Sequence, residues 1–242
     1  MKHDELAGAE LLEVIEKAKE FLEQEKERGL ELIRMSRETW TALEDSAQRA
    51  DAAPAKTDPE AALAALNDIV QDCSKCPLAS TRTNVVFGQG NPRAKLVFVG
   101  EAPGADEDAQ GLAFVGRAGQ LLTRIIEAID LKRTDVFICN ILKCRPPGNR
   151  TPTSIEIESC IPYLMKQLKA IDPKIICALG NSAAQTLLNT KSPMGRMRGR
   201  FHKFGDALLM PTYHPAALLR NPAYKKDVWE DVQMIQRELE KL

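Results

Sequence analysis

Short apolar runs alternate with longer helical patterns from residue 60 onward, and this alternation constrains the fold more than any other sequence feature. The expected strands are Leu96–Val99, Val136–Ile141, Ile175–Leu179 and Ala207–Met210. The expected helices are Pro59–Val70, Gly119–Ile129, Thr153–Ala170, Asn181–Leu188 and Tyr224–Leu242. Such alternation predicts a mainly parallel sheet with helices on both faces. Ligands of such sheets bind at the carboxyl ends of the strands. We therefore expect the chemistry just after Val99, Ile138, Leu179 and Met210.

The first 53 residues have a different pattern. They contain no proline and two glycines, and apolar residues recur at helical spacing between charged ones. We expect residues 1–53 to form a helical N-terminal extension that packs on the main domain, on a second copy or on a partner. Residues 54–59 are expected to form a linker, and residues 60–242 the main domain.

Charge and hydropathy exclude several classes of protein. The 242 residues carry 33 Lys and Arg against 34 Asp and Glu, so the net charge of −1 does not indicate a nucleic-acid partner. Residues 1–50 hold 8 basic and 13 acidic residues, which leaves the remainder basic. No stretch has the roughly 18 apolar residues of a membrane span, and the charged N-terminus is unlike a signal peptide. We expect a cytoplasmic protein that acts as a monomer.

Four of the six cysteines have positions that suit a metal site. Cys73 and Cys76 form a Cys-x-x-Cys pair in a loop, Cys144 lies in a second loop, and Cys160 follows inside a helix. The pair alone fits zinc, a redox dithiol or an iron–sulfur site, whereas four thiolates from three segments suit structural zinc or a cluster. The two other cysteines are expected to be buried and unreactive in strands: Cys139 and Cys177.

Several loops carry residues with more than one interpretation. The segment 100–108 combines glycines with four carboxylates, which fits a ligand site or an acidic surface turn. Phe114 fits the core or a stacking platform for a flat ring. The segment 191–203 has five basic residues and no acidic one, which suits phosphate contact or a solvated loop. His214 can donate a hydrogen bond or act in acid–base chemistry, and residues 216–219 fit the core or a wedge in a base stack.

Together these motifs resemble those of the family-four uracil-DNA glycosylases, the iron–sulfur branch of that superfamily. The matching segments are Gly-Glu-Ala-Pro-Gly at 100–104, Phe-Val-Gly-Arg-Ala-Gly-Gln at 114–120, Lys-Cys-Arg-Pro-Pro at 143–147 and His-Pro-Ala-Ala-Leu at 214–218. The resemblance covers about residues 68–240. It implies a three-layer α/β/α sandwich with a central, mainly parallel four-stranded sheet. It also implies a structural four-iron–four-sulfur (4Fe-4S) cluster, whose ligands are Cys73, Cys76, Cys144 and Cys160.

The resemblance further implies how uracil is bound. His214 is expected near uracil O2, where it stabilises the departing anion, and Phe114 is expected to stack on the flipped ring. Asn140 is expected to read the polar edge of the base. A side-chain amide offers one donor and one acceptor side by side, which matches uracil O4 and N3–H and mismatches the same edge of cytosine.

Three acidic-loop positions also receive roles from the resemblance. Ala102, expected among the uracil-binding residues, stands where the best-known family of the superfamily has an aspartate that orients the attacking water. Its place is expected to be taken by Glu101 or by backbone groups, or else charge stabilisation carries most of the rate. Glu107 is expected to crowd the C5 face of the base and exclude the thymine methyl, whereas Asp106 and Asp108 are interpreted as solvated charges. Leu218, with Leu219, is expected to be the wedge that fills the space of the flipped base. The other expected DNA-contacting residues are Ser182, Arg196, Arg198, Arg200 and Arg220.

The expected function is therefore hydrolytic removal of uracil from DNA, single- or double-stranded, as a step of base excision repair. Two alternatives remain open from the sequence. One is a binding module that holds or traps uracil-DNA without turnover, and the other is a nucleotide-binding α/β protein with structural zinc. A measurement of glycosylase activity distinguishes the expected uracil-DNA glycosylase from both alternatives. Visible absorbance distinguishes an iron–sulfur cluster from zinc.

Overall fold

A computed structural model describes residues 58–242 of the chain. The helical extension expected over residues 1–53 and all but the end of the expected linker lie outside the described residues. The first described helix, α3 (Pro59–Gln71), agrees with the helix expected there, and a proline at its first position suits a helix start.

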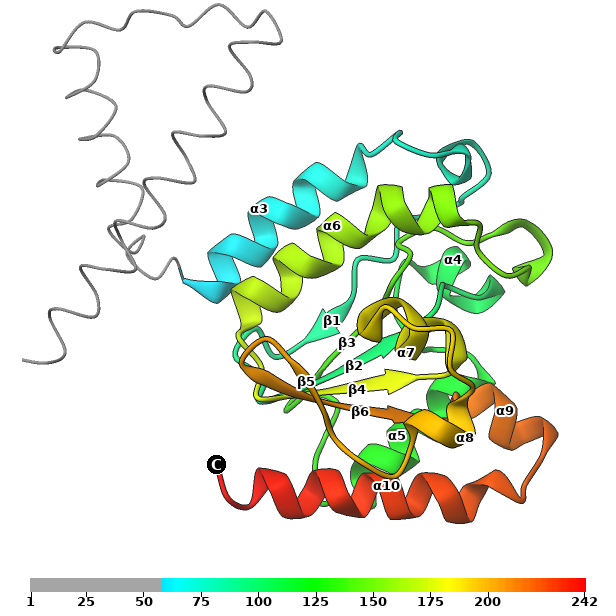
Figure 1. Cartoon of the computed structure of the whole chain (residues 1–242). Helices are drawn as coiled ribbons and strands as arrows, with labels where there is room; N and C mark the ends of the chain where they lie inside the picture. Colours follow the sequence, from blue (N-terminus) through cyan, green and yellow to red (C-terminus); the bar gives the residue numbers. More distant parts are fainter. Residues whose placement is uncertain (1–57) are drawn as a thin grey trace, which may run out of the picture. The chain divides into compact units, whose positions relative to one another are not determined.

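The centre of the molecule is a six-stranded sheet with the order β1-β3-β2-β4-β6-β5 (Figure 1). The four expected strands make its parallel centre. One short strand pairs antiparallel at each edge. The strands are β1 (Gln89–Gly90), β2 (Leu96–Gly100), β3 (Phe137–Asn140), β4 (Ile175–Leu179), β5 (His202–Phe204) and β6 (Ala207–Thr212). The expected number of four strands is corrected to six, because two- and three-residue edge strands carry no apolar run.

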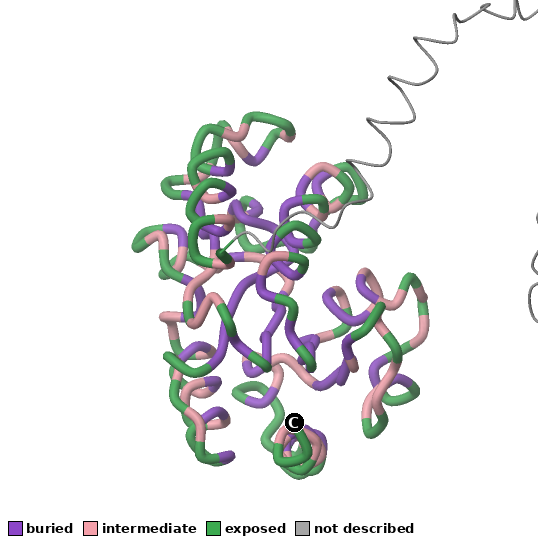
Figure 2. The backbone as a smooth tube through the Cα atoms, turned by 90° about the vertical axis from the view of Figure 1, so that its left-hand side faces the viewer, coloured by how far each residue is buried: buried purple, intermediate pink, exposed green. Residues whose placement is uncertain are grey.

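Helices cover both faces of the sheet, as expected for three layers. Alternate residues of β2 show the division, since Val97 and Val99 pack in one apolar layer and Leu96 and Phe98 in the other. Helices α3, α6 (Ser154–Ile171), α7 (Asn181–Leu188) and α8 (Met194–Met197) contribute to the first layer. Helices α5 (Arg117–Glu127), α9 (Pro215–Arg220) and α10 (Tyr224–Leu239) contribute to the second. Figure 2 shows the buried strands at the centre and exposed outer sides on the helices.

The described helices of eight residues or more were expected from the sequence, whereas the shorter ones were not. Helix α7 has the expected bounds, and α5, α6 and α10 differ from theirs by up to three residues. The unexpected elements are α4 (Ala105–Gln110), α8, α9, and the 3₁₀ turns η1 (Pro77–Ser80) and η2 (Pro147–Asn149). Helices of six residues or fewer show too little periodicity to be recognised. Across the described part of the chain, no helix has the length and apolarity needed to cross a membrane.

The topology brings four strand ends to one edge of the sheet. In the parallel register Gly100 lies beside Asn140, and Leu179 lies beside Thr212. The chain leaves β2 for β3 on one side and reaches β4 on the other, so the strand order reverses at β2. Binding sites of open α/β sheets form at such reversals. The loops that follow Gly100, Asn140 and Thr212 therefore enclose the candidate site.

Candidate active site

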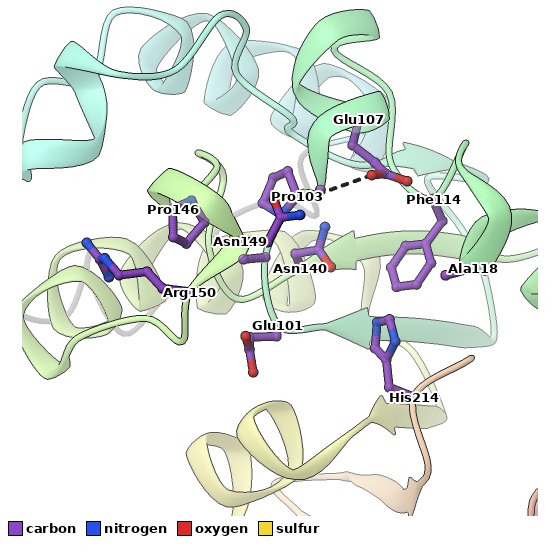
Figure 3. Close-up of a pocket in the computed structure, with 12 residues that line it drawn as sticks. Glu101, Pro103, Glu107, Phe114, Ala118, Asn140, Pro146, Asn149, Arg150 and His214 are labelled. Atoms are coloured by element: carbon purple, nitrogen blue, oxygen red, sulfur yellow. Dashed lines mark hydrogen bonds between the residues drawn. The ribbon is translucent and has the colours of Figure 1, made fainter. Parts of the chain in front are cut away.

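A pocket of about 180 Å³ opens at this edge of the sheet (Figure 3). Its volume is smaller than the roughly 300–1,000 Å³ of sites for drug-sized ligands and suits a single ring. All six residues expected at the catalytic and uracil-binding positions line it: Glu101, Ala102, Glu107, Phe114, Asn140 and His214. Six further residues, which the sequence interpretation missed, complete the lining: Pro103, Gly104, Ala118, Pro146, Asn149 and Arg150.

Asn140 presents a buried side-chain amide to the pocket. It is the last residue of β3 and 1% exposed, and its Oδ1 has no hydrogen-bond partner. Among the described residues it is the only buried side-chain polar atom without a partner. Gly100 makes room for the amide, because a Cβ there would lie 2.3 Å from Oδ1 and 2.6 Å from Cζ of Phe114. A buried oxygen without a partner indicates that a donor arrives with a ligand.

Phe114 is held in an unusual backbone conformation beside this amide. Its φ of 54° lies in the left-handed region that few non-glycine residues adopt. Arg133 donates from Nη1 to the Phe114 carbonyl at 3.2 Å and from Nη2 to the Ala113 carbonyl at 2.8 Å. Gly119 approaches so closely that a Cβ there would collide with the Phe114 carbonyl. These contacts fix a ring that sequence alone could not assign to the core or to the site.

His214 faces the Phe114 ring, with 5.5 Å between the ring centroids (Figure 3). The backbone N–H of Ala216 donates to His214 Nδ1 at 3.1 Å, so Nδ1 carries no proton and the neutral ring carries it on Nε2. Burial, together with the positive charge of Arg220, lowers the pKa of His214 from 6.5 to about 4. The ring is therefore a neutral hydrogen-bond donor at neutral pH.

The two pocket carboxylates have different surroundings. Glu107 accepts three backbone hydrogen bonds, from Gly104 at 3.1 Å, Val115 at 2.9 Å and Gly116 at 3.0 Å. Its carboxylate thus holds the loop after β2 against the start of α5, a role that the sequence interpretation did not include. Glu101 directly follows β2, and in the view of Figure 3 its carboxylate turns away from the Asn140 amide.

The loop between β3 and α6 supplies three of the six lining residues that were not among the expected site residues. Pro146, Asn149 and Arg150 come from its turn, where Asn149 has a φ of 55°. Arg150 donates to both carboxylate oxygens of Glu156, whose pKa it lowers to about 2. The position of this loop after a parallel strand was the available signal.

The four expected ligand cysteines line a common cavity. Cys144 and Cys160 are buried there, and Cys73 and Cys76 are half-buried. Arg82 donates to Cys144 Sγ at 3.4 Å and to the Cys73 carbonyl at 2.7 Å. Within residues 58–242, no three His, Cys, Asp or Glu side chains are placed to hold one metal ion. Four thiols from three chain segments are a donor set that could hold an iron–sulfur cluster, with each thiolate on a different iron atom.

Hydrogen bonding and burial of these thiols also suit a cluster. The backbone N–H of Lys143 donates to Cys160 Sγ at 3.3 Å, and N–H donors to ligand sulfurs are usual around iron–sulfur clusters. Burial raises the pKa of the Cys160 thiol to about 11. As expected, the two remaining cysteines are buried in β3 and β4: Cys139 and Cys177.

The expected DNA-contacting residues divide into accessible and inaccessible ones. Arg198 is directed into the protein, where it donates to both carboxylate oxygens of the buried Asp231 at 3.0 Å. Leu218 of α9 is 2% exposed and packs in the second apolar layer, so the exposed candidate for the wedge is Leu219, which is 40% exposed. The guanidinium of Arg198 is engaged in the ion pair with Asp231, and its expected phosphate contact stays a prediction. The accessible candidates are Ser182, which is half-buried, and the exposed Arg196, Arg200, Leu219 and Arg220.

Comparisons with known proteins agree with this geometry. A family profile described as the uracil DNA glycosylase superfamily matches residues 87–233. The type-4 uracil-DNA glycosylase of Saccharolobus solfataricus is 46% identical over 181 residues, which cover 71% of this chain and 84% of that protein. That of Archaeoglobus fulgidus is 45% identical over 70% of this chain and 91% of its own length. The type-4 uracil-DNA glycosylase of Thermotoga maritima is 43% identical over 69% of this chain and 90% of its own length.

Proposed function

The chain belongs to the uracil-DNA glycosylase superfamily, and from this premise we infer that it excises uracil from DNA. The reaction hydrolyses the bond between uracil N1 and the deoxyribose C1′, releases uracil and leaves an abasic site. One observation carries the inference on this chain's own residues, namely the unpaired, buried Oδ1 of Asn140 in a pocket for one ring. A base that brings an N–H donor to this oxygen completes its hydrogen bonding.

The pocket explains how uracil is selected over cytosine. The Asn140 amide accepts from N3–H and donates to O4, and it would meet an unprotonated N3 and an amino group on cytosine. Phe114 stacks on the ring, and its fixed backbone keeps that surface in place. Glu107, tied by three backbone N–H groups, is a rigid wall suited to excluding a methyl group at C5.

Charge development in the reaction explains the role of His214. As the N-glycosidic bond breaks, the sugar gains positive charge and uracil gains negative charge. The Nε2–H of the neutral His214 ring donates a hydrogen bond to O2, where the negative charge accumulates. Water adds to C1′ and releases a proton, which balances the uracil anion. Glu101 orients this water, because the carboxylate of Glu107 is already held by the backbone.

DNA binding uses residues around the pocket mouth. Leu219 is the wedge that fills the space of the flipped base, an extrusion that costs a few kcal/mol. Phosphates are contacted by the exposed Arg196, Arg200 and Arg220 and by Ser182 at the start of α7.

The four cysteines Cys73, Cys76, Cys144 and Cys160, which line one cavity, would hold a 4Fe-4S cluster. The cluster would cross-link three chain segments and carry no step of the hydrolysis. Cys144 directly precedes the loop that contributes Pro146 to the pocket, so the cross-link supports the pocket mouth. Six cysteines, four of them proposed as cluster ligands, suit a reducing, cytoplasmic compartment. The catalytic domain spans residues 60–242.

Single-turnover cleavage of a labelled oligonucleotide with one uracil tests this function. We expect strand breakage after alkali only when uracil is present, with thymine and cytosine at the same position as controls. Absence of breakage by a protein that contains its iron would overturn the enzymatic assignment. Tight binding to the uracil oligonucleotide without breakage would identify a trapping module instead.

A further inference from the structure

Lys143 carries a buried side-chain amine that the proposed chemistry does not use, and burial lowers the pKa of this amine. Lys143 lies three residues beyond the end of β3 and is 1% exposed. Its ammonium donates to the backbone carbonyl of Asn140 at 2.8 Å and to Oε1 of Gln167 at 2.6 Å. Neither oxygen carries a charge. Burying an amine against two uncharged oxygens costs free energy, and an apolar side chain of similar volume would avoid that cost. The ammonium therefore points to a role beyond filling the core.

The partners of Lys143 define that role. Gln167 lies on α6, and its Nε2 donates to the Phe87 carbonyl at 2.9 Å. The ammonium therefore connects Asn140 to an amide that is itself anchored to a second chain segment. All of these groups are buried, so the connection is shielded from water, where such hydrogen bonds are strongest.

Asn140 is the residue on which this connection acts. Its carbonyl accepts from the Lys143 ammonium, while its side-chain amide faces the pocket with an unpaired Oδ1. Fixing the carbonyl orients the peptide group, and the peptide group sets the direction of the Asn140 side chain. A recognition group must be held by such supporting contacts, because a misplacement of about 1 Å can reduce activity about 100-fold.

We propose that Lys143 is a positioning residue, whose ammonium fixes the Asn140 backbone so that the Asn140 amide meets the polar edge of uracil. The inference rests on the proposed function and deepens it, because it assigns part of base recognition to a side chain outside the pocket. Lys143 touches neither substrate nor reacting atoms and is not a catalytic residue.

The test uses the iron-loaded full chain and three variants. Lys143→Met removes the ammonium at similar volume, and Gln167→Met removes the far partner while the bond to Asn140 remains. Lys143→Met with Gln167→Met removes both polar groups, which limits the loss of stability that an unpaired buried Gln would cause. Single-turnover excision, inhibition by free uracil and binding to abasic-site DNA are measured for each protein, with thermal stability and iron content.

We expect both variants that lack the ammonium to bind free uracil about 10- to 100-fold more weakly and to need more DNA for half-maximal excision. Binding to abasic-site DNA should be unchanged, since that product offers no base to Asn140. Gln167→Met should lose stability and keep most of its uracil affinity.

Three results would overturn the inference. They are wild-type uracil inhibition in the double variant, an equal loss of abasic-site binding, and loss of iron, which would assign Lys143 to the cysteine site. A wild-type protein that fails to excise uracil would instead overturn the proposed function, so the two failures are distinguishable.

Discussion

Individual backbone contacts determine how the pocket side chains can act. The Ala216 N–H selects one tautomer of His214, and Arg133 holds the Phe114 carbonyl in a left-handed turn. In the acidic loop, Asp108 was interpreted as a solvated charge, and that interpretation is wrong. Asp108 is buried and accepts from the backbone N–H groups of Thr83 and Asn84. Its sequence neighbours could not reveal this, because the donors lie about 25 residues earlier.

The neutral state of His214 predicts the pH dependence of excision. Its pKa of about 4 lies below the ordinary value of 6.5, so the folded protein favours the uncharged ring. The contribution of this group to stability is therefore present above 6.5 and is lost as pH falls toward 4. We expect single-turnover rates without a His214 titration between about pH 6 and 8, and a decline as pH approaches 4. A rate that rises on acidification through 6.5 would contradict the neutral-donor role.

Replacement of His214 tests the same role directly. We expect His214→Ala to reduce the single-turnover rate about 100- to 1,000-fold, the usual effect of losing a donor to a developing anion. Affinity for abasic-site DNA should remain. His202→Ala is the matched control, because His202 lies in β5 and does not line the pocket. An equal loss of rate and product affinity in His214→Ala would indicate a structural histidine.

At the scale of elements, α10 anchors the basic segment 191–203. The buried Asp231 of α10 accepts from Arg198, from the Gly199 N–H and from Thr212 Oγ1, the last at 2.6 Å. Thr212 ends β6, two residues before His214. A single carboxylate thus joins the basic segment to the strand that presents the histidine. Arg198 stabilises this junction, while Arg196 and Arg200 remain exposed.

This division predicts opposite phenotypes for neighbouring arginines. Arg198→Ala leaves the buried Asp231 carboxylate without its cationic partner, so we expect a loss of roughly 3 kcal/mol in the free energy of unfolding. Arg196→Ala should leave stability unchanged, weaken DNA binding regardless of sequence, and lower the salt-dependence slope by about 1. Denaturant unfolding and salt titrations of DNA affinity measure both effects. Wild-type stability in Arg198→Ala would contradict the anchoring role.

At the scale of the whole domain, the four cysteines of the shared cavity lie on three separate chain segments. Cys73 and Cys76 follow α3, Cys144 follows β3 and Cys160 lies within α6. A cluster bound to all four would therefore fix one end of the first apolar layer, next to the loop that borders the pocket.

Removal of one ligand tests this cross-link. We expect Cys160→Ala to lose iron and visible absorbance and to unfold at lower temperature, because ligand binding free energy contributes to folding. Cys177→Ala is the matched control, since Cys177 is buried in β4 and outside the cysteine set. It should keep its iron, with a stability loss limited to a small cavity. Full iron content in Cys160→Ala would exclude Cys160 as a ligand.

Local sequence patterns were enough to predict the fold class, the parallel strands and the residues that gather at their carboxyl ends. These features follow from local pattern, because apolar runs specify buried strands and parallel strands bring their ends together. The tertiary structure decided which side chains are available. Leu218 is buried and Leu219 exposed, Arg198 is paired across 33 residues with Asp231, and Lys143 across 24 residues with Gln167. Burial and pairing depend on partners that are distant in the chain, so they cannot be predicted from a local sequence pattern.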